Sequence, residues 1–557
     1  MGSTLSFASL IALKTIGRRM AETEELRDVY EPQVIEAWPA IFKWTAYFFV
    51  AHVQNKSLDI DYPGMSGLMS SAIVQSWLDL CCSPKIQEIV VATRGSIEIA
   101  ALLWLMEDSF LGTPSWSLPC ASTLLTKLVN TTRTAELRDR VLAAVGDIDT
   151  VTKTALMRLK RATAQRRFVG DLAYFSYLAI VYDLSIDEHP IEAAFLEMDT
   201  IQAMTRGLRL IAAEINVDTG SLESKRNLLN GIIAGFMYLS NSLESGTGPA
   251  DVIQSINAGL IEAFVECSPY YEHIPANNWI SIELIFNIVV PKYLVYSSLI
   301  RAVSESICRL QGTPRLRNLR NTVAWKPFQK LCKLALERLL IKRYAKNTSD
   351  LCDNLKCEQH KLKKDFLTCG SCHTACYCSA ACQKVAWKSG HRDECENFRH
   401  EYLTKLPEAN VKRDKTFMDL LVTYYAGNEL PRLRESTRKD YPDVPLSAFL
   451  LIIDFRDVPP SFTLRPPDSP DSDGEGKPEP EPPIVKDGGT PVGCFLPSGK
   501  HKKGFVTHGT SAVLHLWDDP RGREPFGLYT GDSNDGTLVL LNELQKICPK
   551  FQRSGKT

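Results

Sequence analysis

The feature that most constrains this chain is a cysteine cluster. Eight of its 16 cysteines lie within the 44 residues from Cys352 to Cys395. The first twelve residues have no basic region ahead of their apolar ones, which predicts no secretory signal and a reducing, intracellular compartment, without separating nucleus from cytoplasm. Disulfides are then disfavoured. Since the segment has few large apolar residues, we expect it to depend on bound metal for its fold.

The potential ligands in this segment form four close pairs. They are Cys352 with Cys357, Cys369 with Cys372, Cys378 with Cys382, and His391 with Cys395. Eight thiolate and imidazole ligands fill two tetrahedral sites, so the sequence predicts two Zn²⁺ ions in closed, structural sites. The spacing allows sequential or interleaved pairing of the four pairs.

Three other side chains in the segment could compete as ligands. Cys376 lies only two residues before Cys378, so we interpret it as a bystander that is too close to chelate with its neighbour. His360 and His373 are interpreted as surface residues. Ser379 is expected to cap a short helix through Lys388, with Cys382 near the helix N-terminus, where the dipole favours a thiolate.

The segment resembles the MYND zinc finger. The matching text is Cys352-x4-Cys357, Cys369-x2-Cys372, Tyr377-Cys378-x3-Cys382-Gln383-x3-Trp387 and His391-x3-Cys395. Many members have C-x2-C as the first pair, and the wider C-x4-C resembles uncharacterised fungal MYND proteins with long helical N-terminal regions. The resemblance covers less than a tenth of the chain.

The resemblance carries implications for the ligand sets and for binding. It implies interleaved sites, one with Cys352, Cys357, Cys378 and Cys382, and the other with Cys369, Cys372, His391 and Cys395. In MYND domains of corepressor type, the residues that match Gln383 and Trp387 contact short proline-containing peptides, so these two are our candidate peptide-binding residues. They are spaced i, i+4 on the expected helix and therefore share a face.

Most of the chain is predicted to be helical. Residues 20–346 show apolar residues at helical spacing, punctuated by residues such as Pro84, Pro190 and Pro275, which predicts an all-α domain. Its form is a bundle or an armadillo- or HEAT-like helix stack, although no repeated signature is visible. The whole protein is expected to be mainly α.

A basic stretch covers residues 309–346, with eleven Lys and Arg residues and one acid, Glu337. Its second half is an amphipathic helix with an apolar stripe that includes Phe328, Leu331 and Cys332. One interpretation is a patch for nucleic acid or an acidic partner. The favoured alternative is a solvated face of the last helix of the domain.

The C-terminal part is predicted to be a small α+β unit. Residues 401–458 should hold a helix near 414–426 and a buried strand at 447–455, and residues 492–548 should supply short strands. Between them, residues 459–491 contain ten prolines mixed with Asp, Glu, Ser and Gly. This composition cannot bury enough apolar area to offset the ordering entropy, so the stretch is expected to be disordered.

We interpret the protein as a non-enzymatic, zinc-binding scaffold for protein–protein interaction, with a role in transcriptional regulation as the process that the resemblance suggests. The balance of 64 Lys+Arg and 65 Asp+Glu disfavours a general nucleic-acid binder, which leaves the stretch 309–346 as an alternative. A SET-type lysine methyltransferase is a further alternative, but the chain has no Asn-His pair of the N-H-x-C type. No membrane span is expected, and M-G-x-x-x-S at Gly2 loosely fits N-myristoylation.

Overall fold

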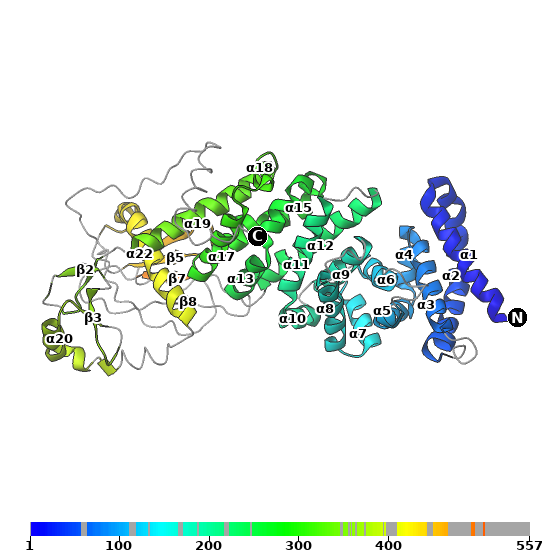
Figure 1. The fold of residues 1–557 in the computed structure, drawn as a ribbon, viewed down its shortest axis with the longest axis horizontal. Coiled ribbons are helices and arrows are strands. Elements are labelled where there is room, and N and C mark those ends of the chain that lie inside the picture. Colours follow the sequence, from blue (N-terminus) through cyan, green and yellow to red (C-terminus); the bar gives the residue numbers. More distant parts are fainter. Residues whose placement is uncertain are drawn as a thin grey trace. The chain divides into compact units, whose positions relative to one another are not determined.

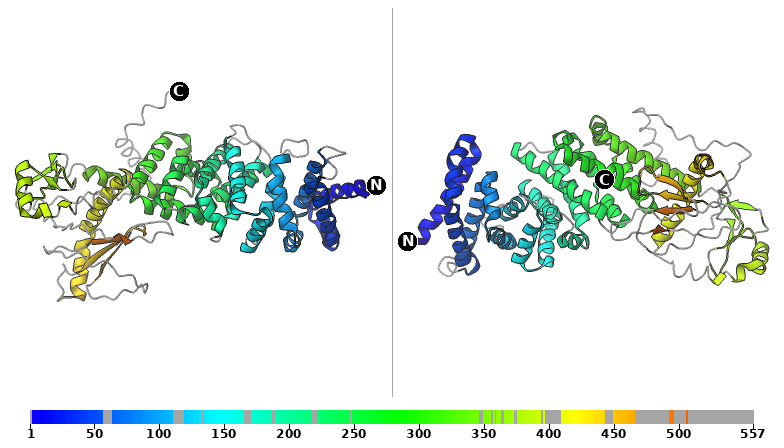
Figure 2. Two further views of the ribbon diagram at one scale, coloured as in Figure 1. Left: turned by 90° about the horizontal axis from the view of Figure 1, so that it is seen from below. Right: turned by 180° about the vertical axis from the view of Figure 1, so that it is seen from behind.

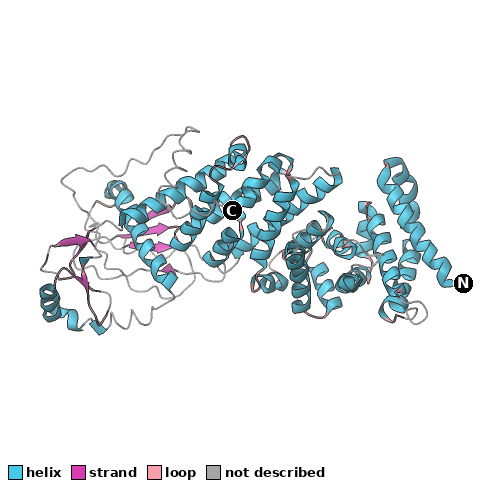
Figure 3. Ribbon diagram, viewed as in Figure 1, coloured by secondary structure: helices cyan, strands magenta, loops and turns pink. Residues whose placement is uncertain are grey.

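The structure is a computed structural model of the 557-residue chain. It describes residues 2–56, 64–110, 119–131, 134–164, 171–186, 189–216, 222–245, 248–345, 349–442 (without 355–356, 358, 363–364, 373–374, 394 and 397–408), 449–465, 492–495 and 505–506. In these segments helices predominate, and strands begin only at Ser349 (Figure 3). The prediction of a mainly α protein is therefore confirmed.

The chain divides into two compact units. The first holds Met1–Ser242 with Ala258–Ile282, and the second holds Leu243–Asn257 with Glu283–Thr557. The sequence predicts one helical domain at 20–346, whereas the boundaries between the two units fall inside this range. Helices α12, α13 and α15 each continue across one of the boundaries between the units.

The first unit is built only from helices in its described residues (Figure 1). They are α1 (Gly2–Glu22), α2 (Glu24–Phe48), η1 (Phe49–Gln54), α3 (Met65–Leu80), α4 (Pro84–Ala92), α5 (Ser96–Phe110), α6 (Cys120–Val129), α7 (Ala135–Val145), α8 (Ile148–Ala164), α9 (Asp171–Leu184), α10 (Pro190–Leu196), α11 (Thr200–Ile215), α12 (Leu222–Ser245), α14 (Leu260–Cys267), η2 (Ser268–His273) and α15 (Ala276–Leu284). The armadillo- or HEAT-like form of the stack stays a prediction.

The helix starts in this unit agree with the sequence at two prolines and differ from it at the N-terminus. Helices α4 and α10 begin at Pro84 and Pro190, as the punctuation predicts, because proline suits the first helical turn. Helix α1 begins at Gly2, whereas the sequence places the domain start near residue 20. The earlier start has a packing reason, since Leu10 and Met20 are buried.

Two buried charges of the first unit, on Glu107 and Arg158, are paired with each other in its core. Glu107 of α5 accepts the backbone N–H groups of Ala121 and Ser122 at 2.8 and 2.9 Å and thereby caps the start of α6. Arg158 of α8 lies 3.5 Å from Glu107 and bonds Asp108 at 2.7 Å. These pairs join α5, α6 and α8, because an unpaired charge at this depth would be costly.

The second unit combines helices with short strands. It contains α13 (Pro249–Ala258), η3 (Ile285–Val289), α16 (Val290–Tyr293), α17 (Ser297–Leu310), α18 (Pro314–Leu319), α19 (Trp325–Ala345), β1 (Ser349–Leu351), β2 (His360–Leu362), β3 (Leu367–Thr368), β4 (Cys376–Tyr377), α20 (Ala380–Ala386), η5 (Trp387–His391), α22 (Ala409–Asp440), β5 (Leu450–Asp454), β6 (Ser461–Arg465), β7 (Val492–Phe495) and β8 (Phe505–Val506).

The C-terminal strands form one four-stranded sheet in the order β6-β5-β7-β8. The pairs β5–β6 and β7–β8 are antiparallel, and β5–β7 is parallel. Helix α22 packs against β5 and β6, and Figure 2 shows this helix in yellow beside the strands. Tyr425 of α22 contacts the rings of Phe455 and Phe462, with centroids 5.9 and 6.2 Å apart, so the apolar face of the sheet is covered by this helix.

Two C-terminal boundaries differ from the sequence analysis. Helix α22 is much longer than the predicted 414–426, because it continues through Gly427 and Pro431. Strand β6 occupies 461–465, inside the stretch 459–491 that is predicted to be disordered, so that prediction does not hold for these five residues. Residues 466–491 lie outside the described residues, as do the predicted strand segments after residue 506.

The basic stretch 309–346 has a mixed environment. Phe328, Leu331 and Cys332 of α19 are buried, as the apolar stripe predicts. Arg338 is also buried, over the rings of Tyr425 and Phe455 at 5.8 and 5.9 Å from their centroids. The stretch is therefore not a uniformly solvated face, since α19 also packs against α17 and α22.

In the described parts of the chain, no single helix has the length and apolar character needed to cross a bilayer. One bent pair, Pro84–Ala92 with Ser96–Ser109, meets the test of length and composition only when its two helices are joined across a 95° bend.

Candidate metal centres

Two short hairpins and one helix position the cysteine cluster. Strand β1 pairs with β2, and β3 pairs with β4, both antiparallel. Cys352 follows β1, and Cys369 follows β3. Each hairpin thus places one ligand pair at its end, which allows side chains distant in sequence to converge.

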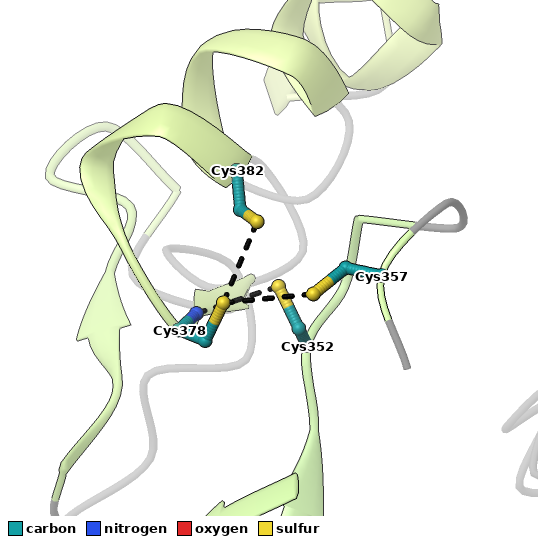
Figure 4. A group of neighbouring side chains, drawn as sticks. All are labelled: Cys352, Cys357, Cys378 and Cys382. Carbon is teal, nitrogen blue, oxygen red and sulfur yellow. Dashed lines mark hydrogen bonds between the residues drawn. The ribbon is translucent and has the colours of Figure 1, made fainter. Parts of the chain in front are cut away.

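The first ligand set holds Cys352, Cys357, Cys378 and Cys382, whose sulfurs all lie within 4.8 Å of one another (Figure 4). The sulfur of Cys378 is 3.6 Å from that of Cys357 and 3.4 Å from that of Cys382. The backbone N–H of Cys378 also points to the sulfur of Cys352 at 3.4 Å. Cys352 is buried and the other three are half-buried.

The second set holds Cys369, Cys372, His391 and Cys395, all buried. The sulfurs of Cys369 and Cys395 are 3.9 Å apart, and the sulfur of Cys372 is 3.8 Å from Nε2 of His391. Nε2 is therefore the imidazole atom that faces the thiols. The two sets have the interleaved arrangement, not the sequential one.

The donor geometry fits zinc. A tetrahedral Zn²⁺ with sulfurs at about 2.3 Å has ligand–ligand distances of about 3.8 Å. The distances of 3.4–3.9 Å between ligand atoms in the two sets bracket this value. Thiolate-rich, four-ligand sets select Zn²⁺ over Mg²⁺ or Ca²⁺. The finger therefore holds ligands for two zinc ions, one in each set.

The pKa values of the ligand thiols differ widely within the first set, so its four thiols do not ionise together without a cation. Hydrogen bonds from Asn354 and then Ser379 lower the pKa of Cys382 to about 6. The neighbouring Cys382 sulfur, together with burial, raises the pKa of Cys378 to about 12. In the second set, burial opposes ionisation of Cys369, but the backbone N–H of Cys372 and the side chain of His391 outweigh it and lower its pKa to about 6. Thiols this close cannot all ionise unless a cation offsets their charge.

The helix expected after Ser379 is present. The hydroxyl of Ser379 accepts the backbone N–H of Cys382 at 3.2 Å and caps α20. The first turn of α20 therefore holds a ligand where the helix dipole favours a thiolate. After Ala386 the chain continues as the π-helical turn η5, which ends at the ligand His391.

Cys376 does not belong to either set among the described residues. It lies in β4, where its backbone N–H bonds Asp353 Oδ2 at 2.5 Å and its carbonyl accepts the N–H of Asp353 at 2.9 Å. These two hydrogen bonds connect β4 to the turn after Cys352. Sequence reasoning missed Asp353 and Asn354 as positioning residues, although both stand between the ligands Cys352 and Cys357.

The sequence offers two further histidines as competing ligands. His360 lies in strand β2, but its side chain is outside the described part of the structure. His373 lies outside the described residues.

Residues 352–395 match the family model of the MYND finger. This segment is a MYND-type zinc finger. No curated protein and no solved structure matches the chain. The MYND finger is a zinc-binding protein-interaction module, which indicates protein partners for this segment.

The two candidate peptide-binding residues lie on one face of the MYND finger. The backbone N–H of Trp387 bonds the carbonyl of Gln383, so the two are one helical turn apart. Gln383 is half-buried, and 39% of the surface of Trp387 is exposed. The indole meets the ring of His391 edge-on, with centroids 5.7 Å apart, and Tyr377 contacts the same imidazole at 5.8 Å. The zinc ligand is thus held between two aromatic rings.

Proposed function

We propose that the MYND finger binds short proline-containing peptides through Gln383 and Trp387, and that the protein acts as a non-enzymatic scaffold in transcriptional regulation. The observation that supports this is the position of Trp387. Its indole rests against the zinc ligand His391 and still exposes 39% of its surface. An exposed indole held in place offers a flat apolar face to a proline ring, and little ordering entropy is lost on binding.

Gln383 supplies the polar part of this surface. Its amide can donate to and accept from the backbone of an extended peptide, and such a peptide has no internal hydrogen bonds. One turn of helix separates it from Trp387, so both reach the same ligand. A Pro-containing segment therefore matches both residues.

The non-enzymatic part of the proposal rests on the ligand count. Each zinc set has four protein ligands, which fill a tetrahedral site and leave no position for a water or substrate. The zinc ions would then hold the binding surface in shape and take no part in a reaction.

The test is binding of the full-length, zinc-loaded protein to an array of proline-containing peptides. Gln383→Ala and Trp387→Ala should each weaken selected peptides, the latter by about tenfold or more, as expected for a Trp anchor. Val385→Ala is the matched control, because Val385 is 41% exposed on the same helix but two residues from each candidate.

Zinc content is measured for every variant. Weaker binding by a variant that still holds two zinc ions supports the proposal. Equal binding by the parent protein and Trp387→Ala, or selective binding lost equally in Val385→Ala, would contradict it.

A further inference from the structure

A basic surface covers the end of α17, α18 and the first turns of α19. Its exposed and half-exposed cations are Arg309, Arg315, Arg317, Arg320, Lys326, Lys330 and Lys333. The sequence from Ser306 to Leu336 contains no Asp or Glu. Figure 1 shows α18 at the N-terminal end of α19, so these segments adjoin.

The position of these charges is not explained by helix stability. Helices α18 and α19 start within the surface, and neither has an acidic residue in its first turn. A helix N-terminus carries a partial positive charge, so cations such as Arg315 and Lys326 are unfavourable there. Lys326 and Lys330 are also spaced i, i+4, where like charges repel. In the described part of the chain, neither lysine has an ion-pair partner.

We propose that this basic surface binds the acidic stretch 468–481 of the same chain. That stretch contains six acids, Asp468, Asp471, Asp473, Glu475, Glu479 and Glu481, and one lysine. It lies outside the described residues, between β6 and β7. The chain thus carries a concentrated negative charge and a concentrated positive charge within one unit.

The ends of the connecting chain bring the two within reach. Arg465 at the end of β6 pairs with Leu450, and Val492 at the start of β7 pairs with Leu451. Both ends of the 26-residue connection, 466–491, therefore leave the same end of β5. Half of it extends up to about 43 Å.

The distance to be spanned is shorter than that. Strand β5 leads to Phe455 over about 17 Å. Phe455 contacts Arg338, and Lys326 lies about 18 Å further along α19. Even placed end to end, these lengths come to about 40 Å, so the midpoint of the connection, next to Glu479, reaches the basic surface.

The expected strength follows from the tether. A flexible connection whose r.m.s. length matches the span gives an effective concentration in the millimolar range, and a contact with a Kd of about 0.1 mM would then be formed about nine-tenths of the time. The contact is electrostatic, and it should weaken as the Debye length falls from about 10 Å at about 0.1 M salt to about 3 Å at about 1 M.

The experiment measures lysine acetylation rates in the full-length, zinc-loaded protein by mass spectrometry. The parent is compared with a variant in which the six acids are replaced by Asn or Gln. Lys326 and Lys330 should react about tenfold faster in the variant, and the parent should match it in high salt. Lys153 is the control: it is exposed and pairs with Asp149 at 2.6 Å, so its rate should not differ between the two proteins.

Zero-length carbodiimide cross-linking provides a second readout. Cross-links from Lys326 or Lys330 to the stretch 468–481 that persist on dilution support binding within one chain. Equal acetylation rates in parent and variant would overturn the proposal. Cross-links that form only between differently labelled chains would also overturn it. So would protection of the two lysines by a single-stranded oligonucleotide, if the six substitutions leave their acetylation rates unchanged.

Discussion

At the scale of single residues, the zinc ligands separate cleanly from a neighbouring cysteine. Cys352→Ser removes one of four ligands from the first set, so we expect the protein to hold one zinc ion in place of two. Cys376→Ser should leave both ions bound, because Cys376 is in neither ligand set and its bonds to Asp353 come from its backbone. Zinc content is measured by elemental mass spectrometry after dialysis.

The outcome for Cys376 decides this prediction. Loss of a zinc ion in Cys376→Ser with retention of both in Cys352→Ser would show that the ligand set is wrong. Loss in both variants would mean that the turn around Cys352 depends on the Cys376 side chain.

The sequence predicts the ligands well because their chemistry requires particular residue types at short spacings. It leaves the pairing of Cys352 with Cys378 open, since spacing allows two arrangements, and the positions of the ligand atoms in the folded structure decide between them. It cannot reveal Asn354 as a donor to Cys382, because a single Asn between two cysteines has no pattern of its own.

At the scale of helices and strands, Gly17 and Gly427 form an informative pair. A Cβ at Gly17 of α1 would lie 2.5 Å from the backbone carbon of Asp79 in α3, whereas at Gly427 of α22 nothing lies within 4 Å. Gly17→Ala should therefore destabilise the first unit by about 1–3 kcal/mol despite the better helix propensity of alanine. Gly427→Ala should stabilise the second unit by about 0.5–1 kcal/mol.

Calorimetry measures both substitutions through the unfolding transition of each unit. A gain in stability for Gly17→Ala would mean that α1 and α3 do not pack this closely. A loss for Gly427→Ala would show that the position is not open to solvent.

The contact between α2 and α4 predicts a pH dependence. Ser83, the N-cap of α4, donates to Glu31 of α2 at 2.5 Å, and Lys85 bonds the same carboxylate. The bonds from Lys85 and Ser83 lower the pKa of Glu31 below its usual 4.5. A lowered pKa in the folded state stabilises the fold above the unfolded pKa, and this stability is lost as the pH falls through the folded pKa.

Glu31→Gln tests this contact. Because a charge-assisted bond becomes a neutral one, we expect a loss of about 1 kcal/mol at pH near 7. The difference from the parent should begin to shrink as the pH falls past about 4.5, and it should be lost once the pH is below the lowered folded-state pKa of Glu31. Thermal unfolding across this pH range is the measurement, and a difference that is constant with pH would contradict the prediction.

The sequence predicts which segments are helical better than it predicts where each helix begins and ends. Apolar spacing identifies most helices, and Pro84 and Pro190 mark two of their starts. The continuation of α22 through Pro431 depends on its packing against α19 and the sheet, which local propensity does not include. Strand β6 likewise forms because β5 offers it backbone partners along five residues, and a composition rule for disorder cannot see such a partner.

At the scale of the whole molecule, the sequence predicts a helical domain, a zinc finger and a C-terminal α+β unit. It does not predict which of the helices pack together in one compact unit. Residues 243–257 belong to the second unit although helical residues of the first unit lie on both sides. Such a division depends on contacts between distant residues. The finger, by contrast, is self-contained in its packing: its buried cluster consists of its own residues, chiefly Phe366, Tyr377 and the ligand cysteines.

Removal of zinc should therefore have a local effect. The finger has a core too small to fold without metal, and structural zinc contributes on the order of 10–16 kcal/mol in finger peptides. Chelation of both ions should abolish amide protection in residues 349–396, and protection in α3 and α19 should stay unchanged. Hydrogen–deuterium exchange of the full-length protein, with and without chelator, measures both regions at once. Loss of protection in α19 on chelation would mean that the finger stabilises the helices of its own unit, and the scaffold could then not be treated as a helical body with an independent zinc module.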